Sequence, residues 1–363
     1  MFRALLSRSF KRQGGVRGAV FPSSRPSQGW LAPSGIRKPF DESLRKLDQP
    51  YPQPYYSYDD NTHKWMRFEA GPGKKVPAGV EPALDLRRLA LYSWNVDARP
   101  RFPQARMDAA LHHIEELASK LPPTVAVVIF LQECVELSLD GIRDRGWIRE
   151  RFHVTDLDSG AWGQLEFGTT ALVDRRLRIA SCFRVYYSKS RLMRDACFVD
   201  VELGAGGAAP LTVRLCNTHL DALSVLPPYR PRQVWLIAQH LRSPAVGAGV
   251  VAGDFNATEA YDRTLHSENR LRDAYLELGG REDAPDSHTW GPQAQTALKT
   301  RHPAVRMDKV LFTGPLTPRS FERFGIDIQL WNPMQQSYIL DQGYEKPWIS
   351  DHYGVVANFD VDS

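Results

Sequence analysis

The segment at residues 250–258 constrains the fold more than any other part of the chain. It reads Val-Val-Ala-Gly-Asp-Phe-Asn-Ala-Thr, so a short apolar run reaches Gly253 and is followed by Asp254 and Asn256. An apolar run that ends at a glycine predicts a buried strand that enters a loop. Because side chains alternate along an extended chain, Asp254 and Asn256 can point to the same side. Taken alone, the segment also fits a polar turn whose side chains bind their own backbone.

Other strand-like segments of the chain end in the same kinds of polar residue. Such segments are predicted at 89–94, 125–131, 211–216, 308–312 and 355–359. The polar residues at or beside their ends are Asn95, Glu133, Asn217, His219, Asp308, Asp351 and His352. Each has an ordinary structural explanation: Glu133 fits a surface carboxylate, Asp308 a partner for Arg306, and His352 a hydrogen-bonded histidine. Together they favour one shared site, because burying six polar strand ends without a ligand is unfavourable.

The order of the predicted elements indicates the fold class. Helices are expected at 104–120, 142–152 and 231–241, and further strands at 168–173 and 196–203. Strands outnumber helices, and the helices interrupt them irregularly. This favours an α/β fold with two facing mixed β-sheets flanked by helices, a four-layer sandwich, over a Rossmann-type sheet. The sequence has no glycine-rich phosphate loop after a strand, so nucleotide-cofactor chemistry is not supported.

Charge is unevenly placed along the 363 residues. Residues 1–40 carry eight cations and no acid, whereas the formal net charge of the whole chain is only +4. The remainder is therefore mildly acidic, which argues against a broad basic face for long duplex DNA but allows a local basic groove. The first twelve residues combine arginine and serine with apolar residues at helical spacing. This pattern is typical of a mitochondrial transit peptide, and the alternative is a basic tail of a nuclear or cytoplasmic protein.

Composition predicts three parts of the chain. We expect a basic tail at 1–40, a Pro/Gly-rich linker or edge segment at 41–85, and a folded domain at 86–363. No apolar stretch is long enough to predict a membrane span. The four cysteines lack the close pairing of a zinc site or a disulfide framework, so we expect small buried residues in a reducing compartment. A monomer is the default expectation.

The polar set has the composition that phosphodiester cleavage requires. Such a reaction uses an oxygen-ligated divalent cation, a group that aligns water, and donors for the charge that develops on phosphorus. Six motifs sharpen this interpretation: Trp-Asn-Val-Asp (94–97), Leu-Gln-Glu (131–133), Asn-Thr-His-Leu (217–220), Gly-Asp-Phe-Asn (253–256), Arg-Met-Asp (306–308) and Ser-Asp-His (350–352). In this order and approximate spacing, they resemble the endonuclease/exonuclease/phosphatase superfamily, which has the DNase I-like fold. The resemblance covers about residues 88–360.

The resemblance implies a metal site and a site for the attacking water. Glu133 resembles the direct Mg²⁺ ligand of the family, with Mn²⁺ able to substitute. Asn95 and Asp351 resemble residues that support the metal. Asp254 resembles the residue that aligns or deprotonates the attacking water, and Asn256 resembles its neighbour that holds the nucleophile and the phosphate.

The resemblance also implies donors to the scissile phosphate. His352 resembles the histidine that donates to this phosphate, and Asp308 resembles the residue that orients it. His219 resembles a second phosphate donor, with Asn217 beside it. The expected reaction is a single in-line displacement at phosphorus.

Within the superfamily, the sequence is similar to the 5′-tyrosyl-DNA phosphodiesterase group, which removes tyrosine adducts from DNA 5′ ends. The resemblance rests on Trp-Asn-Val-Asp, Phe-Gly-Thr (167–169), Arg-Pro-Arg-Gln (230–233) and Ser-Asp-His-Tyr-Gly (350–354). It implies DNA ends or DNA–protein adducts as partners and a role in DNA repair. The sequence departs from the group at Asp-Ala-Arg-Pro-Arg-Phe (97–102), which lacks the expected Gly-Leu. It also departs at Phe255, where the group has Thr, and at His-Thr-Trp-Gly (288–291).

Three further residues are candidates for substrate contacts. Trp290 is expected to stack on a substrate ring or base, and its alternative is a half-buried core tryptophan. Arg230 and Arg232 are expected to meet phosphates that flank the site, and their alternative is a surface position without a partner.

Two other functions stay open at this stage. One is a phosphoesterase of the same superfamily for a different nucleic acid, a nucleotide or a lipid headgroup, which the mildly acidic body allows. The other is a catalytically silent binding protein on this scaffold. The presence of Glu133, Asp254, Asp308 and His352 argues against the silent protein, because such a relative is expected to have lost at least one of them.

Overall fold

The computed structural model describes residues 46–77, 86–163, 166–204, 210–222 and 225–361. Within them, the strands form two sheets. The seven-stranded sheet has the order β1 (Pro50–Pro52), β8 (Arg178–Tyr186), β9 (Asp195–Leu203), β10 (Leu211–His219), β11 (Ala248–Asp254), β13 (Asp308–Thr313) and β12 (Arg272–Asp273). The eight-stranded sheet has the order β14 (Leu316–Phe324), β15 (Gly354–Val361), β4 (Arg88–Asn95), β5 (Val125–Cys134), β7 (Gly168–Asp174), β6 (Phe152–Val154), β2 (Tyr55–Asp59) and β3 (Lys64–Phe68).

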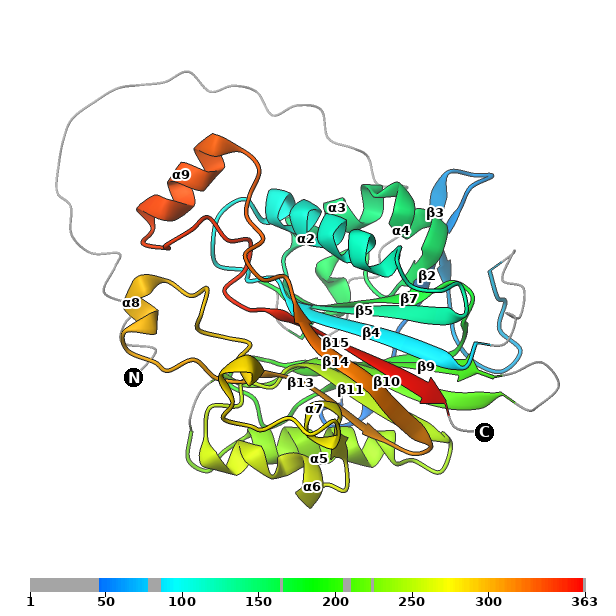
Figure 1. Cartoon of the computed structure of the whole chain (residues 1–363). Coiled ribbons are helices and arrows are strands. Elements are labelled where there is room, and N and C mark those ends of the chain that lie inside the picture. Colours follow the sequence, from blue (N-terminus) through cyan, green and yellow to red (C-terminus); the bar gives the residue numbers. More distant parts are fainter. Residues whose placement is uncertain (1–45, 78–85, 164–165, 205–209, 223–224, 362–363) are drawn as a thin grey trace. The chain divides into compact units, whose positions relative to one another are not determined.

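Helices cover the outer faces of both sheets (Figure 1). The described helices are α2 (Pro103–Ala118), α3 (Glu136–Asp144), α4 (Gly146–Arg151), α5 (Arg230–Leu241), α6 (Leu265–Glu268), α7 (Ala274–Glu277), α8 (Thr296–Lys299) and α9 (Pro333–Asp341), with short 3₁₀ turns at Ser159–Ala161, Ala260–Arg263 and Pro285–Ser287. The first three pack on the eight-stranded sheet, while α5 and α6 pack on the seven-stranded sheet. Among the described residues, no helix combines the length and apolarity needed to cross a membrane.

A central core between the sheets explains why the strands read as apolar runs. Side chains such as Val128 of β5 and Val250 of β11 are fully buried in this layer. A strand with sheet on one face and helix on the other is apolar on both faces, and β5 is buried along nearly its whole length. The predicted four-layer α/β sandwich is confirmed.

The segment before residue 86 contributes strands to both sheets. β1 pairs antiparallel with β8, and β2 pairs antiparallel with β6 and β3. Tyr55 is buried in the central core. Residues 50–68 therefore contribute strands at the edges of both sheets, ahead of the predicted domain start at residue 86. The predicted tail at 1–40 lies outside the described residues.

Two local features differ from the expectation. The helix predicted at 142–152 is two short helices, because Arg145 adopts an extended conformation between α3 and α4. The strands β8 and β14 were not predicted, since both contain arginines that interrupt an apolar pattern. The four cysteines are buried and free, as expected.

Candidate active site

Strand register aligns three of the predicted site residues in the seven-stranded sheet. β10 and β11 run parallel, and their register places His219 opposite Asp254. β11 and β13 run antiparallel, and their register places Asp254 opposite Asp308. The three side chains therefore belong to one row across neighbouring strands, although the residues lie far apart in the sequence.

The eight-stranded sheet contributes the residues that face this row. β4 and β5 run parallel, so Asn95 and Glu133 lie at the same end of the sheet. The Asn95 amide donates to Glu133 Oε1 at 3.3 Å and to Asp254 Oδ2 at 3.0 Å. Because Asp254 belongs to the other sheet, Asn95 connects the two halves of the site. His352 lies just before β15, which pairs with β4.

His352 is held between two buried carboxylates. Its Nδ1 lies 2.8 Å from Asp308 Oδ2, and its Nε2 lies 3.7 Å from Asp254 Oδ2. Burial disfavours the imidazolium, but the charges of Asp308 and Asp254 raise the pKa of His352 well above its usual value. An Asp308 carboxylate and a protonated His352 Nδ1–H form a charge-assisted hydrogen bond. The geometry therefore favours an imidazolium with Nδ1 on Asp308 and Nε2 directed toward Asp254 and Asp351.

Asp254 is held as a carboxylate at the centre of the row. Its Oδ2 lies 3.2 Å from His219 Nε2, and its Oδ1 accepts the backbone N–H of Asn256 at 2.8 Å. Burial favours the protonated acid, but the imidazoles of His219 and His352 and these hydrogen bonds lower its pKa. The Asn256 amide donates to the Leu220 carbonyl at 3.0 Å. Asp254 is therefore ionised and fixed, as a group that aligns water must be.

Unusual backbone conformations occur at these strand ends. Glu133 and Asn256 have positive φ values of 57° and 48°, in the left-handed region that non-glycine residues seldom adopt. Gly253 has φ 149°, and a Cβ there would lie 1.8 Å from the Thr218 carbonyl oxygen of the neighbouring strand. Only glycine allows β11 to pass β10 this closely immediately before Asp254. Strained conformations of this kind concentrate at functional sites.

Asp351 is held by two donors from distant segments. Arg99 Nη2 donates to Asp351 Oδ2 at 2.5 Å, and Trp290 Nε1 donates to the same oxygen at 3.0 Å. Burial and the charge of Asp97 raise the pKa of Asp351 to about 6, although Arg99 acts in the opposite direction. A bound cation would favour the ionised form. Asp351 therefore has the environment of a metal-supporting carboxylate rather than that of an ordinary surface acid.

The side chains of two predicted site residues form hydrogen bonds to other protein groups. Trp290 lies at the site, is only 7% exposed and donates to Asp351. It is therefore more buried than the half-buried core alternative, and its stacking on substrate stays a prediction. Asn217 is fully buried and bridges the sheets: it accepts from Gln132 and donates to the carbonyls of Leu131 and Thr170. Its side chain has no free group to offer a phosphate.

The two arginines expected to flank the site differ in exposure: Arg230 is buried and Arg232 is exposed. Arg230 is 1% exposed and pairs bidentately with Asp262, so the prediction that it meets a phosphate is wrong. Arg232 is exposed, lies over the ring of Trp235 and approaches Asp48 at 3.3 Å. It keeps a solvent-facing position, and its contact with substrate stays a prediction.

A hollow beside His219 contains residues that the sequence did not single out. Phe167, Thr169, Met193, Arg194, Asp195 and His219 are among the residues that line it. Arg194 is 7% exposed and lies over the Phe167 ring at 4.8 Å, and its Nε has no partner among the described residues. Burial lowers the pKa of Arg194, whereas the charges of Glu133 and Asp254 raise it. A buried guanidinium near the row of His219, Asp254 and Asp308 is suited to binding an anionic substrate. The Phe-Gly-Thr motif was the available signal in the sequence.

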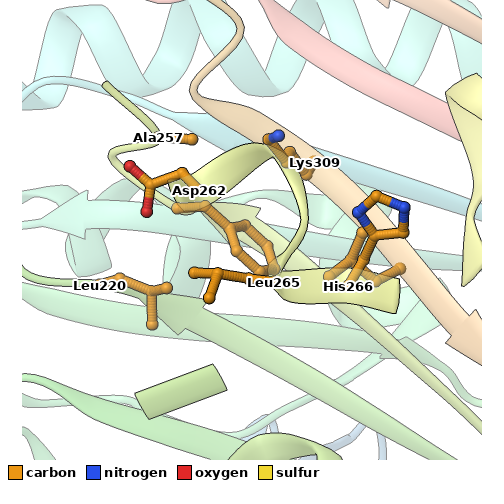
Figure 2. Close-up of a pocket in the computed structure, with 8 residues that line it drawn as sticks. Leu220, Ala257, Asp262, Leu265, His266 and Lys309 are labelled. Atoms are coloured by element: carbon orange, nitrogen blue, oxygen red, sulfur yellow. The ribbon is translucent and has the colours of Figure 1, made fainter. Parts of the chain in front are cut away.

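A second hollow is formed by residues that follow β10 and β11, by residues of β13 and by the segment around α6 (Figure 2). It is lined by Leu220, Phe255, Ala257, Asp262, Leu265, His266, Lys309 and Leu311. Phe255 packs in the core of this layer, because alternation along the chain turns it away from Asp254 and Asn256. Phe255, where the sequence departs from the tyrosyl-DNA phosphodiesterase group, therefore points into the core. Lys309 donates to Glu282 at 2.7 Å and is not directed at the site.

The site has more acidic oxygen atoms than donors to satisfy them. Among the described residues, buried oxygens of Asp97, Asp308 and Asp351 have no hydrogen-bond partner. Buried carboxylate oxygens without partners are unfavourable unless a cation binds them, and oxygen ligands are those that Mg²⁺ prefers. Ligand atoms of Asp254, Asp308 and His352 also lie within 4.8 Å of one another. His352 is hydrogen-bonded to Asp308, and its raised pKa favours the imidazolium. A positively charged histidine is a poor metal ligand, so this geometry favours a phosphate-donor role for His352.

The chain belongs to the Endonuclease/Exonuclease/phosphatase family, which it matches over residues 92–352. It is therefore a metal-dependent phosphoesterase, and the site described above lies within the matched region. No curated protein sequence matches the chain.

Solved structures share the fold. D. rerio TDP2 in complex with a single-strand DNA product matches with a TM-score of 0.53 and 19% identity, over 75% of this chain and 99% of that chain. Truncated Caenorhabditis elegans TDP2 matches with a TM-score of 0.54 and 20% identity, over 76% of this chain and 99% of that chain. A mannosyl-6-phosphatase from Bacteroides thetaiotaomicron matches with a TM-score of 0.52 and 14% identity, over 75% of this chain and 99% of that chain. At these identities the likeness establishes the fold and not the substrate.

Proposed function

We propose that the protein is a Mg²⁺-dependent phosphodiesterase that hydrolyses 5′-phosphotyrosyl bonds at DNA ends. The observation that carries the reaction is the row of His219, Asp254 and Asp308, with His352 bound to Asp308 at 2.8 Å. The choice of substrate is supported by the motifs shared with the tyrosyl-DNA phosphodiesterase group and by the fold shared with TDP2, one solved structure of which holds a single-strand DNA product.

The residues present fit a divalent cation. Glu133 and Asp351 supply carboxylate oxygens, and Asp351 Oδ1 has no hydrogen-bond partner among the described residues. Asn95 holds Glu133 in place. These groups would hold Mg²⁺ or, in its place, Mn²⁺. When bound, the cation supplies Lewis-acid stabilisation of charge on the phosphoryl oxygens.

The chain's own residues position the water and the phosphate. Asp254 is ionised and accepts a hydrogen bond from water, which it aligns for in-line attack with the help of Asn256. His352 donates from Nε2 to a non-bridging phosphate oxygen, while Asp308 keeps it protonated and oriented. His219, whose Nε2 lies 3.2 Å from Asp254 Oδ2, is the second donor to the same phosphate. A single donor of this kind typically contributes about 10²–10³-fold to the rate.

The test is release of tyrosine from a 5′-phosphotyrosyl oligonucleotide by the full-length chain, with Mg²⁺ and with EDTA. The Asp254→Asn variant serves as the inactive form, and Asp200→Asn is a matched control, because Asp200 is a buried acid paired with Arg214. We expect Mg²⁺-dependent release that Asp254→Asn loses and Asp200→Asn retains. Failure of the wild-type chain to release tyrosine would overturn the substrate assignment.

The fold shared with a mannosyl-6-phosphatase favours one alternative, a phosphoesterase for another substrate. Abasic-site duplex, poly(A) RNA, inositol polyphosphate, sphingomyelin and a sugar phosphate therefore belong in the same assay. Turnover of one of these alone, lost in Asp254→Asn, would keep the site and replace the substrate. Absence of turnover with every substrate would support a silent scaffold.

We also propose that residues 1–40 direct the protein to mitochondria. The support is the acid-free run of eight cations among apolar residues. Fusion of these residues to a fluorescent protein tests the proposal: mitochondrial fluorescence supports it, and nuclear or diffuse fluorescence contradicts it.

A further inference from the structure

A half-exposed arginine borders the carboxylates of the site. Arg99 lies in the loop after β4, and its side chain is 52% exposed, whereas those of Asp97 and Asp351 are 0% and 1% exposed. Its Nε donates to Asp97 Oδ1 at 3.2 Å, and its Nη2 donates to Asp351 Oδ2 at 2.5 Å. Two buried acids therefore hold a guanidinium whose remaining surface faces solvent.

A second arginine of the same segment shows what a purely structural role looks like. Arg106 is 2% exposed and donates to the backbone carbonyls of Val96, Asp97, Pro100, Arg101 and Ile349. No donor of Arg106 is left for a ligand. In contrast, Nη1 of Arg99 has no hydrogen bond to any residue that the structure describes. Arg99 therefore keeps donor capacity that Arg106 lacks.

The position of Arg99 relates it to the reacting phosphate. It binds one oxygen of Asp351, and the other oxygen of that carboxylate lies 3.9 Å from His352 Nε2. A single carboxylate thus separates the guanidinium from the imidazole that is proposed to contact the scissile phosphate. An anionic substrate must approach several acids here, and an adjacent exposed cation reduces that repulsion. The side chain also lies where the sequence departs from the tyrosyl-DNA phosphodiesterase pattern, so it is a feature of this chain.

We propose that Arg99 binds a non-bridging oxygen of the phosphate next to the scissile one and thereby selects substrates that carry a second phosphate. This inference rests on the proposed function, because it assumes phosphodiester hydrolysis at the site. A planar guanidinium that keeps free donors is suited to a phosphate oxygen. Arg99 is a specificity residue in this account, and the acids beside it fix its direction.

The test compares two chromogenic esters of the same leaving group. Thymidine 5′-(p-nitrophenyl) phosphate has only the scissile phosphate, whereas a short oligothymidylate with the same ester at its 5′ end adds neighbouring phosphates. We expect Arg99→Gln to lower kcat/KM for the oligonucleotide ester about tenfold to a hundredfold, mainly through KM, because a charge-assisted hydrogen bond is lost. At saturating Mg²⁺ the nucleoside ester should lose clearly less than the oligonucleotide ester, because it lacks the neighbouring phosphate and loses only the contact of Arg99 with Asp351. Arg99→Lys should recover part of the difference between the two esters.

Arg101→Gln is the matched control, because Arg101 is an exposed arginine of the same loop that lies over the Tyr338 ring. Equal losses on both esters in Arg99→Gln would overturn the proposal and assign Arg99 to positioning Asp351. Equal losses in Arg99→Gln and Arg101→Gln would also overturn it, in favour of the general charge of the loop. If the wild-type chain hydrolyses neither ester, the proposed function itself fails, and the inference falls with it.

Discussion

Two of the buried clusters of charged residues in this protein differ in how their polar atoms are hydrogen-bonded. In one, Arg184 is 0% exposed and donates to Gln53, Asp156, Thr169 and Asp195. All three guanidinium nitrogens have partners. In the other, the active site, acids outnumber the bases that face them, and three buried carboxylate oxygens have no partner among the described residues.

The difference shows which buried polar cluster maintains the fold and which is prepared for a ligand. A fully hydrogen-bonded cluster fixes its surroundings and needs nothing further. A cluster with excess negative charge and unpaired oxygens is stabilised by a cation from solution. The two are connected, because Asp195 binds Arg184 and also lines the hollow beside His219. The structural cluster therefore supports one wall of the active site.

The largest effect is expected at the centre of the ligand-binding cluster. Asp254→Asn removes the group that aligns water while keeping its shape, so we expect phosphodiester hydrolysis to fall by about 10³- to 10⁴-fold. The free energy of unfolding should change far less than in a variant of the structural cluster. Steady-state kinetics and urea unfolding measure the two quantities. A large loss of stability with modest loss of activity would contradict the distinction between the clusters.

The opposite pattern is expected for the structural cluster. Arg184→Met leaves Asp156 and Asp195 buried without their cation, which should lower the free energy of unfolding by about 3–5 kcal/mol. The activity per folded molecule should fall only as far as the wall at Asp195 shifts. Arg178→Met is the control, since Arg178 lies on the same strand as Arg184 but is 48% exposed and pairs with Glu202 of β9. If both variants unfold alike, burial of the Arg184 cluster is not what stabilises the protein.

The sequence predicted that these polar residues lie together, because several predicted strands end in a polar residue. Apolar runs that end in polar residues identified Asn95, Glu133, Asp254 and His352, and strand pairing then places such residues together. For Asp308, the resemblance implied His352 as the partner, and the structural alternative was Arg306. Arg306 pairs with Asp273 and Glu282, whereas Asp308 binds His352, as the resemblance implied.

Loop residues and long-range partners were not predictable in the same way. Arg99 and Asp351 are 252 positions apart, and no periodic pattern connects them. Arg184 interrupts an apolar strand, and only its buried partners explain why the strand forms. From the sequence, Trp290 is predicted to stack on a substrate. Only the structure shows that its indole N–H donates to Asp351.

The charge imbalance of the active site also predicts a pH dependence of metal binding. Burial and Asp97 raise the pKa of Asp351 to about 6, so a proton competes with the metal as pH falls through that value. In the metal-free protein, the free energy of unfolding falls as pH rises from the pKa that Asp351 has in the unfolded chain toward 6, because the folded protein resists ionisation of this acid. Mg²⁺ at about ten times its Kd should recover about 1.4 kcal/mol at pH 8 and much less at pH 5.

Thermal unfolding with and without Mg²⁺ across this pH range is the measurement. Asp351→Asn removes the titrating group, so its remaining Mg²⁺ response should not change near pH 6. A Mg²⁺ response that is equal at pH 5 and pH 8 in the wild-type chain would show that Asp351 does not support the metal.

The smallest effect is expected at Trp290, where two roles can be separated by one substitution. Trp290→Phe keeps an aromatic ring but removes the Nε1 donor to Asp351. If the role of Trp290 is to orient this carboxylate, Mg²⁺ affinity should fall by about tenfold, since a hydrogen bond to a charged group contributes about 1.5–3 kcal/mol. KM for a phosphotyrosyl oligonucleotide at saturating Mg²⁺ should stay unchanged. The reverse result, normal Mg²⁺ affinity with a raised KM, would support a substrate contact for Trp290 and place this residue outside the cluster that holds the cation.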